Sequence, residues 1–378
     1  MSIGLYIHVP FCLRKCLYCD FTSYPVQREQ VQLYLQSLTA EMALYSEELT
    51  GKNKIIETIF VGGGTPTCLM PRYLAEILEQ VGKYFHLPPG AEITTEANPG
   101  TVNLPDLKEL KAAGFNRLSL GVQSTRQELL TLIGRIHNFS EAQQAVADAR
   151  AAGFNNINLD LIFGLPTQTA AHWRQSLSEI LALQPEHISC YGLQWEEGTP
   201  LTKAVEQGQL KPCAEEEELA MFEMARELLG LAGYQYYEIS NFARPGFECR
   251  HNLRYWQNQT YLGLGPAAHS YLDQIRWSNV ENIEEYAALL KQGNRPVADR
   301  TVLTLQEQME ETVFLGLRMI KGVNLASFEQ RFQTPLLEVF GKQVSKLTEK
   351  GLLKLSNGHL KLTEKALPLA NQVFAEFV

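Results

Sequence analysis

The first two thirds of the chain alternate short, β-rich apolar runs with amphipathic stretches of helical period. The apolar runs predict strands at residues 5–9, 58–61, 92–96, 117–120, 157–161 and 187–191. Between them, the pattern predicts helices at residues 31–45, 73–84, 105–113, 140–152 and 171–183. Repeated strand–helix units give parallel strands joined by right-handed crossovers. Six units are too few to close an eight-stranded barrel, so we expect an α/β fold with an incomplete, TIM-like (β/α)6 barrel.

From residue 300 the pattern changes to helices at 305–319, 325–331 and 336–350, followed by an apolar hairpin at 352–362. Asn357-Gly358 within the hairpin is a strong signal for a two-residue turn. Helices followed by a hairpin are typical of a winged-helix-like domain. We therefore divide the chain into a barrel (1–235), a connecting segment (236–299) and a C-terminal, mostly helical domain (300–378).

A winged-helix-like domain suggests DNA binding, but the charge of the chain argues against it. Residues 301–378 carry nine Lys/Arg and eight Asp/Glu, a net charge of +1, and the whole chain carries −9. A lid or docking domain is therefore favoured, and no nucleic-acid partner is expected. No apolar run approaches the roughly 20 residues that span a bilayer, and the N-terminus lacks the basic region of a secretory signal. We expect a cytoplasmic protein without an integral membrane segment.

Three cysteines lie within eight residues directly after the first predicted strand, at Cys12, Cys16 and Cys19. Thiolates at such spacing hold iron–sulfur clusters. Three of them can bind three irons of a cubane and leave the fourth iron open to a small molecule. A structural zinc site, with His8 as a fourth ligand, is the alternative. A disulfide framework is disfavoured because seven cysteines is an odd count and 378 residues is no small scaffold.

Other polar or glycine-rich features follow the next predicted strands. A Gly-Gly-Gly-Thr-Pro run occupies residues 62–66, Glu96 ends the third strand, Gln123 follows the fourth, and Asp160 ends the fifth. Each feature alone could be a turn or a helix cap. Ligand sites of (β/α) barrels lie where the strands end and the loops begin. Together with the cysteines, these features therefore predict a site on that rim.

The cysteine triad and the Gly-Gly-Gly-Thr-Pro run together resemble the radical S-adenosylmethionine (SAM) superfamily. Within it, the chain is similar to the oxygen-independent coproporphyrinogen III oxidase-like group and, in particular, to its HemW heme-chaperone branch. The resemblance runs through essentially the whole chain. Its markers are residues 6–12, 62–66, 96–100, 121–124, 134–137, 158–161 with 164–166, and 251–256.

The resemblance implies a [4Fe-4S] cluster on the three cysteines, with SAM on the open iron. The residues that it places around SAM are Tyr6, Tyr18, Gly63, Gly64, Thr65, Glu96, Gln123, Arg135 and Asp160. Glu96 would neutralise the ammonium of SAM, and Arg135 would pair with its carboxylate, although Arg135 could also form a surface salt bridge. Gln123 and Asp160 would bind the ribose hydroxyls. In the family's reaction, the reduced cluster cleaves SAM to a 5′-deoxyadenosyl radical.

Two departures separate the chain from the oxidases of this group. The oxidases have a fourth cysteine two places after the third, where this chain has Phe21, and they have a longer N-terminal segment. In exchange the chain has a His-Asn-x-x-Tyr-Trp motif at residues 251–256, which the resemblance links to heme ligation by His251. From these six residues alone, a capped helix with packed aromatic rings is the alternative. His269 and Cys249 are weaker candidates for a second heme ligand.

The predicted function is therefore a heme chaperone that carries a radical-type cluster and hands heme to an unknown acceptor protein. The alternative is an oxygen-independent coproporphyrinogen III oxidase, or another radical SAM enzyme acting on a porphyrin-like substrate. A redox-sensing regulator ranks behind both. A reductant protein such as a flavodoxin or a ferredoxin is expected as a further partner. Whether the chain is an enzyme is left open, since both departures put oxidase activity in doubt.

Overall fold

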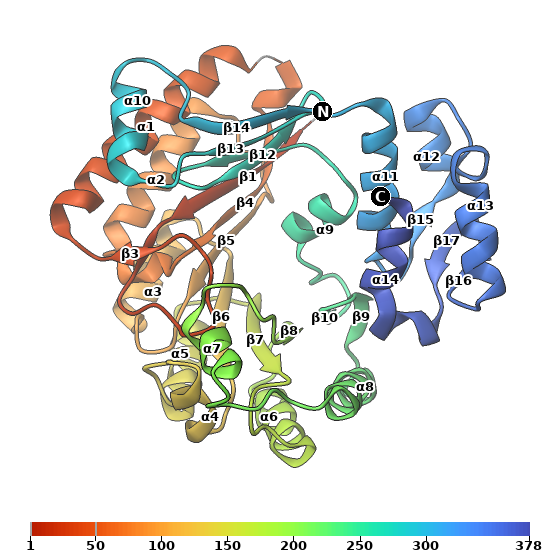
Figure 1. The fold of residues 1–378 in the computed structure, drawn as a ribbon. Coiled ribbons are helices and arrows are strands. Elements are labelled where there is room, and N and C mark those ends of the chain that lie inside the picture. Colours follow the sequence, from red (N-terminus) through yellow and green to blue (C-terminus); the bar gives the residue numbers. More distant parts are fainter. Residues whose placement is uncertain (1, 50) are drawn as a thin grey trace.

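A curved sheet of twelve strands forms the frame of the molecule in the computed structural model, which describes residues 2–49 and 51–378 (Figure 1). The six predicted strands are present and lie side by side, all parallel and in chain order. They are β1 (Ile3–Val9), β4 (Ile56–Gly63), β5 (Glu92–Ala97), β6 (Arg117–Gln123), β7 (Ile157–Phe163) and β8 (His187–Gly192). The sheet ends at β14 on one side and at β9 on the other. The predicted α/β partial barrel is therefore confirmed.

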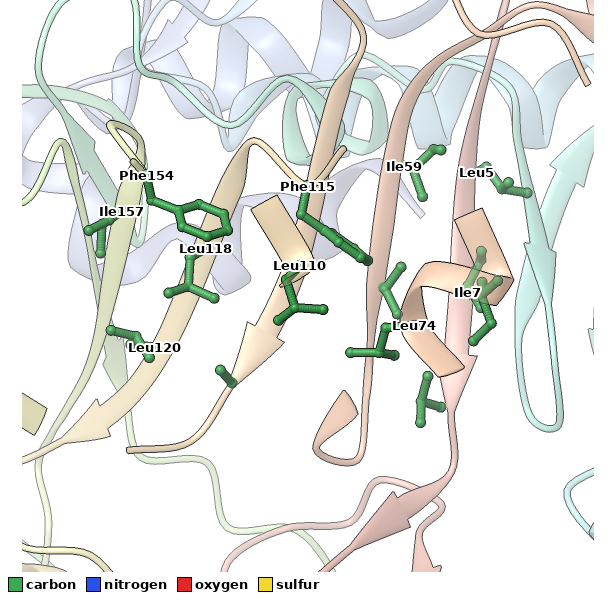
Figure 2. Packing of buried hydrophobic residues seen from close by; sticks show 14 of the residues in the cluster. Leu5, Ile7, Ile59, Leu74, Leu110, Phe115, Leu118, Leu120, Phe154 and Ile157 are labelled. Atoms are coloured by element: carbon green, nitrogen blue, oxygen red, sulfur yellow. The ribbon is translucent and has the colours of Figure 1, made fainter. Parts of the chain in front are cut away.

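The five helices predicted between these strands are also present, and Figure 1 shows them on the outer side of the sheet. They are α1 (Arg28–Glu48), α2 (Pro71–Tyr84), α3 (Leu104–Ala113), α5 (Phe139–Ala151) and α6 (Ala170–Ala182). Leu74 of α2 and Leu110 of α3 share one buried cluster with strand residues such as Ile59 (Figure 2). Each buried side chain of this size contributes about 1.5–3 kcal/mol to folding.

Alternation along the strands separates the apolar outer layer from a polar interior. Successive side chains of a strand point to opposite faces. On β6, Leu118 and Leu120 belong to the apolar cluster under the helices, whereas Ser119 between them bonds Asp160 of β7 across the other face. TIM barrels usually fill their interior with branched apolar side chains. A polar interior in this partial barrel leaves its core available to a polar ligand.

The segment 236–299, which we predicted to be a connection, adds strands to both ends of the sheet. At one end, β10 (Asn241–Ala243) pairs antiparallel with β8 and with β9 (Gln235–Glu238). At the other end, β11 (Tyr261–Leu264) pairs parallel with β1, and three antiparallel strands follow. These are β12 (His269–Leu272), β13 (Ile275–Asn279) and β14 (Val297–Val302). The sequence analysis did not identify these strands.

Five further helices and several short elements complete the barrel. The helices are α4 (Gln127–Leu132), α7 (Pro200–Glu206), α8 (Glu215–Leu231), α9 (Arg250–Trp256) and α10 (Ile283–Lys291). The short elements are β2 (Phe11–Cys12), β3 (Tyr24–Pro25), η1 (Gly51–Lys54) and η2 (Pro66–Cys68). None of the helices among the described residues has the length and apolar composition to cross a membrane.

The C-terminal elements form a unit with a hydrophobic core of its own. Its helices α11 (Leu305–Leu317), α12 (Leu325–Phe332) and α13 (Leu336–Glu349) match the predicted ranges. The predicted hairpin is β16 (Leu353–Ser356) with β17 (His359–Leu362), and β15 (Val323–Asn324) joins β17 as a third strand. The short elements η3 (Glu364–Leu369), α14 (Ala370–Phe374) and η4 (Ala375–Phe377) close the chain. Helices beside a hairpin agree with the predicted winged-helix-like domain.

The C-terminal unit is held against the barrel beside α9 (Figure 1). The Arg318 guanidinium lies over the ring of Trp256, 4.3 Å from its centroid. Arg331 donates to the carbonyl of Asn258 (2.9 Å), and Arg276 pairs with Glu311 (2.8 Å). Apolar contacts join the two parts as well, because Phe222, Tyr236 and Ile239 of the barrel side pack against the core of the C-terminal unit.

Candidate functional site

The three cysteines of the predicted cluster lie on the loop that follows β1. Cys12 ends β2, which pairs with β3, and the other two cysteines lie between these strands. All three are partly exposed and take part in no disulfide. The amide of Leu17 donates to Ile133 (3.0 Å), and its carbonyl accepts from Leu201 (2.9 Å). These bonds anchor the loop at the rim of the barrel where β1 ends.

The surroundings of His8 argue against the zinc alternative. Its Nδ1 lies 3.0 Å from the Tyr6 hydroxyl and its Nε2 lies 2.9 Å from the Thr22 carbonyl, so both ring nitrogens are engaged. Among the described residues, no three or more His, Cys, Asp or Glu side chains surround a single metal position. A tetrahedral zinc site needs four ligands on one ion, whereas each thiolate of a cubane binds a different iron. The donor set therefore fits a cluster.

The glycine run after β4 packs against the start of the cysteine loop. The amide of Gly64 donates a hydrogen bond to the carbonyl of Val9 (2.9 Å), and the amide of Thr65 donates one to the carbonyl of Phe11 (2.7 Å). A Cβ on Gly64 would lie 2.4 Å from the Phe11 carbonyl oxygen. A Cβ on Gly63, whose φ is 105°, would lie 2.5 Å from a ring nitrogen of His8. Only glycine fits at either position, and the close approach brings the Thr65 hydroxyl to 3.6 Å from the sulfur of Cys12.

Arg135 links the cysteine loop to the ends of β5 and β6. Its Nη1 lies 3.4 Å from the Cys16 sulfur, and its Nη2 donates to Asn98 (2.6 Å) and to the Gly121 carbonyl. Its Nε is buried without a partner. A buried guanidinium with an unpaired donor is suited to an anionic ligand such as a carboxylate. The surface salt bridge that the sequence left open for Arg135 is not what the structure shows.

Asn98 is a residue of this site that the sequence analysis did not single out. Its Nδ2 donates to the Thr65 hydroxyl (2.9 Å), and its Oδ1 accepts from Arg135. Cys16, Thr65, Asn98 and Arg135 line the same small pocket beside the cysteine loop. The spacing of the two residues could have identified Asn98. It follows Glu96 by two positions, and alternate residues of an extended chain point to the same side.

Glu96 lies half-buried next to the glycine run and accepts the amide proton of Gly63 (3.1 Å). Its burial, and then the charge of Asp160, raise the pKa of its carboxyl to about 8. Asp160 accepts from Ser119 (3.1 Å) and Asn158 (2.7 Å), and burial raises its pKa as well. A cation placed near these carboxyls would favour their ionised forms. The arrangement therefore suits the ammonium of an amino acid.

The remaining predicted SAM residues surround this group. Gln123 ends β6 in a left-handed backbone conformation (φ 65°) and is buried. Tyr6 lies on β1 next to His8, and burial raises the pKa of its hydroxyl. Tyr18 lies between two of the cysteines in the sequence, and burial followed by the charge of Cys16 raises its pKa. Both tyrosines therefore stay neutral hydrogen-bonding groups.

His251 lies on helix α9, away from the loops at the ends of the strands that hold the other predicted residues. It lies in α9, whose first amides, those of Arg250 and His251, are bonded by the Glu92 carboxylate (3.0 and 2.9 Å). Its Nδ1 lies 2.9 Å from the hydroxyl of Thr58, and its Nε2 lies 2.9 Å from the hydroxyl of Tyr255. His251 and Tyr255 therefore share one face of α9. However, the imidazole is only 1% exposed and both of its nitrogens are engaged, so heme ligation by His251 stays a prediction that would require Tyr255 to move.

A larger cavity of about 720 Å³ opens beside the cysteine loop, between the barrel and the C-terminal unit. This volume lies within the range of small-molecule and cofactor sites. Its walls come from β1, the loop after the cysteines, the end of α9, the strands β11–β13 and helix α11. The residues used below are Tyr6, His8, Phe21, Tyr255, Tyr261, His269, Arg276 and Leu315.

Known proteins resemble the chain in both of its parts. Residues 6–180 match the radical SAM superfamily, and residues 303–369 match the HemN C-terminal domain. The chain is 39% identical to the heme chaperone HemW of Bacillus subtilis, over 99% of this chain and 98% of the relative. The chain belongs to the HemW family of radical SAM proteins. It is also 34% identical to the heme chaperone HemW of Lactococcus lactis, over 99% of this chain and 96% of that relative.

A bovine mitochondrial protein named for its radical SAM domain is 35% identical over 98% of this chain and 86% of its own length. Coproporphyrinogen III oxidase (HemN) of Escherichia coli shares the fold, with a TM-score of 0.86 over 100% of this chain and 90% of that chain, at 24% identity. Membership of the radical SAM superfamily implies a [4Fe-4S] cluster and SAM, as the sequence predicted. The donor set and the unpaired Arg135 Nε fit these cofactors.

The close approach at Gly64 predicts the effect of one added methyl group. Gly64→Ala places its Cβ against the Phe11 carbonyl and should shift the cysteine loop, at a cost of about 1–3 kcal/mol. Gly82→Ala, on α2 with no atom near its Cβ, is the matched control and should be neutral or stabilise by up to about 1 kcal/mol. We expect a lower unfolding temperature and less bound iron in the first variant alone. Equal iron content in both variants would contradict the role of the close approach.

The raised pKa of Glu96 predicts a pH dependence of stability. The unfolded carboxyl titrates near 4.5 and the folded one near 8, so its contribution is fully present below about pH 4.5 and is lost as pH rises through 8. Glu96→Gln keeps the acceptor for Gly63 but cannot ionise. In SAM-free protein, the variant should gain unfolding temperature relative to the wild type across this window. A pH-independent difference between the two would show that Glu96 does not titrate this way.

Proposed function

We propose that this chain is a heme chaperone, which binds heme and transfers it to an acceptor protein. The observation that carries this proposal is the 39% identity, over almost the whole of both chains, to a relative named heme chaperone HemW. A second bacterial relative with the same name is 34% identical over a similar span. The match includes the C-terminal unit, so the proposal concerns the complete arrangement of barrel and C-terminal unit.

In this proposal, Cys12, Cys16 and Cys19 hold the [4Fe-4S] cluster. SAM lies on the side of the cluster that faces the glycine run and the polar interior. Glu96 receives its ammonium, because a half-buried carboxyl with a raised pKa is stabilised as an anion by a neighbouring cation. Arg135 receives its carboxylate, for which its Nε is available. The backbone of Gly63, Gly64 and Thr65 borders the same end of SAM.

The remaining site residues orient and shield the nucleoside. Gln123 and Asp160 would bind the ribose hydroxyls from the ends of β6 and β7. Tyr6 and Tyr18, kept neutral by burial, would close the site toward the cavity and toward the loop. When bound, the reduced cluster and SAM supply one-electron chemistry. The protein positions both groups and limits the access of water to them.

An oxygen-independent coproporphyrinogen III oxidase is the second candidate. The TM-score of 0.86 to the Escherichia coli oxidase supports a common fold, although 24% identity carries no activity with it. Phe21 stands where the oxidases of this group have a fourth cysteine, and its side chain is 60% exposed at the cavity. An exposed phenyl group can neither bind iron nor transfer a proton, and this favours the chaperone.

The cysteine loop is also where a reductant would dock. Leu13, Arg14 and Lys15 are exposed between the first two cysteines. A donor must come close to the cluster, and the two cations would attract an acidic flavodoxin or ferredoxin. The heme acceptor is the second protein partner of this proposal.

Replacing one cysteine tests the ligand assignment. Cys16→Ala should lose most of the protein-bound iron and sulfide after anaerobic reconstitution, because the cubane then keeps only two protein ligands. Cys213→Ala, a partly exposed cysteine just before α8, is the matched control and should retain both. Iron and sulfide analysis measures the result. Full cluster content in the Cys16 variant would overturn the assignment.

The function itself is tested by two reactions of the reduced, cluster-loaded protein. With hemin and then an excess of apomyoglobin, we expect binding followed by transfer, seen as the absorption spectrum of myoglobin. With coproporphyrinogen III and SAM, we expect no protoporphyrinogen. Catalytic formation of protoporphyrinogen would favour the oxidase proposal over the chaperone proposal. Failure to bind hemin would contradict the chaperone proposal.

A further inference from the structure

The cavity beside the cysteine loop has the walls that a flat, largely apolar ligand with charged edges requires. Aromatic side chains line it from four places: Tyr6 on β1, Phe21 after the cysteines, Tyr255 on α9 and Tyr261 on β11. Aromatic faces pack well against a conjugated ring. Leu315 of α11 adds an apolar contact from the C-terminal unit. The cavity can therefore take a tetrapyrrole between barrel and C-terminal unit.

Two histidines line this cavity in the described part of the chain, His8 and His269, and only His269 has a ring nitrogen free to bind a metal ion. His8 uses both nitrogens in hydrogen bonds to Tyr6 and Thr22. His269 is exposed in the cavity, and no hydrogen bond to its ring occurs within residues 2–49 and 51–378. Burial and the charge of Arg276 lower its pKa, so its imidazole is neutral at neutral pH. A neutral imidazole with a free nitrogen is a common axial ligand of heme iron.

The backbone around His269 holds it in a fixed position. His269 begins β12, and a Cβ on Gly263 of β11 would lie only 2.0 Å from its carbonyl oxygen, so glycine permits this approach. The turn before His269 is held by the buried carboxylate of Glu41, which accepts the amide proton of Gly265 (2.8 Å). The same carboxylate accepts from Asn279 of β13 (2.7 Å). The side chain is therefore presented from a rigid element, as a metal ligand requires.

The cavity also offers one cation for the acidic edge of heme. Arg276 is the single Lys or Arg side chain among its described lining residues. It donates to the Tyr261 hydroxyl (3.1 Å) and pairs with Glu311 of the C-terminal unit (2.8 Å). A heme propionate would compete with Glu311 for this guanidinium. Binding of heme and release of the C-terminal unit would then be coupled.

We propose that heme binds in this cavity with His269 as an axial ligand of its iron, and that His251 acts as a positioning residue. This inference rests on the proposed function. His251 bonds the hydroxyl of Tyr255 (2.9 Å) from behind the cavity wall and so orients that ring. The His-Asn-x-x-Tyr-Trp motif thus contributes to heme binding through Tyr255, and the iron is ligated from β12.

The test is a hemin titration of the full-length, cluster-loaded protein. It compares the wild type with His269→Ala and His251→Ala, and with His359→Ala in the C-terminal hairpin as a control. Difference absorption spectra, with and without hemin, remove the contribution of the cluster. We expect the His269 variant to lose the imidazole-ligated spectrum and to bind hemin about ten-fold or more weakly. The control variant should keep both the wild-type spectrum and the wild-type affinity. His251→Ala should keep the ligated spectrum but bind hemin more weakly, because Tyr255 loses the hydrogen bond that orients its ring.

Added imidazole separates a lost ligand from a damaged fold. In His269→Ala, free imidazole should restore the ligated spectrum, since the cavity then holds both heme and the missing ring. A wild-type spectrum and affinity in His269→Ala, or loss of the ligated spectrum in His251→Ala alone, would overturn the inference and leave the proposed function standing. If the wild type itself binds no hemin, the proposed function fails instead.

Discussion

The backbone contact between the end of β4 and the turn after β1 determines where the cysteine loop lies on the rim of the barrel. Gly64 and Thr65 donate to carbonyls on either side of that turn, and the cysteine loop starts from it. Only glycine allows the two segments to approach this closely. Arg135 then ties the far side of the loop to β5 and β6 through Cys16 and Asn98. The cysteines are thus displayed by a rigid scaffold although they lie on a loop.

The interior of the same barrel contains ionisable side chains, which lower the stability of the folded protein. Glu96 and Asp160 are half-buried carboxyls with raised pKa values on the inside of the barrel, and removing such groups from water costs free energy. Asp160 accepts hydrogen bonds from Ser119 and Asn158, whereas Arg135 keeps an unpaired Nε. Groups of this kind persist where a ligand completes their interactions. The outer layer of apolar side chains supplies the stability that compensates for them.

The C-terminal unit and α9 enclose the second feature of the molecule, the cavity beside the cluster loop. It is bordered by residues from both parts of the chain, and ion pairs such as Arg276–Glu311 join its two sides. Polar contacts of this type break more readily than a continuous hydrophobic core. The C-terminal unit has a hydrophobic core of its own, against which Phe222, Tyr236 and Ile239 of the barrel side also pack. A cavity with such walls suits a cargo that must enter and leave.

The sequence by itself determined the six parallel strands, their helices, the C-terminal hairpin and the rim on which the cysteines and Glu96 meet. These follow from local periodicity and from the rule that parallel strands end on one side. Only the tertiary structure decided that β11 lies beside β1, that Asn98 joins Arg135, and that His251 is enclosed while His269 faces the cavity. These features depend on pairings between residues far apart in the chain. No local pattern of apolar and polar residues encodes such pairings, because many distant partners satisfy the same pattern.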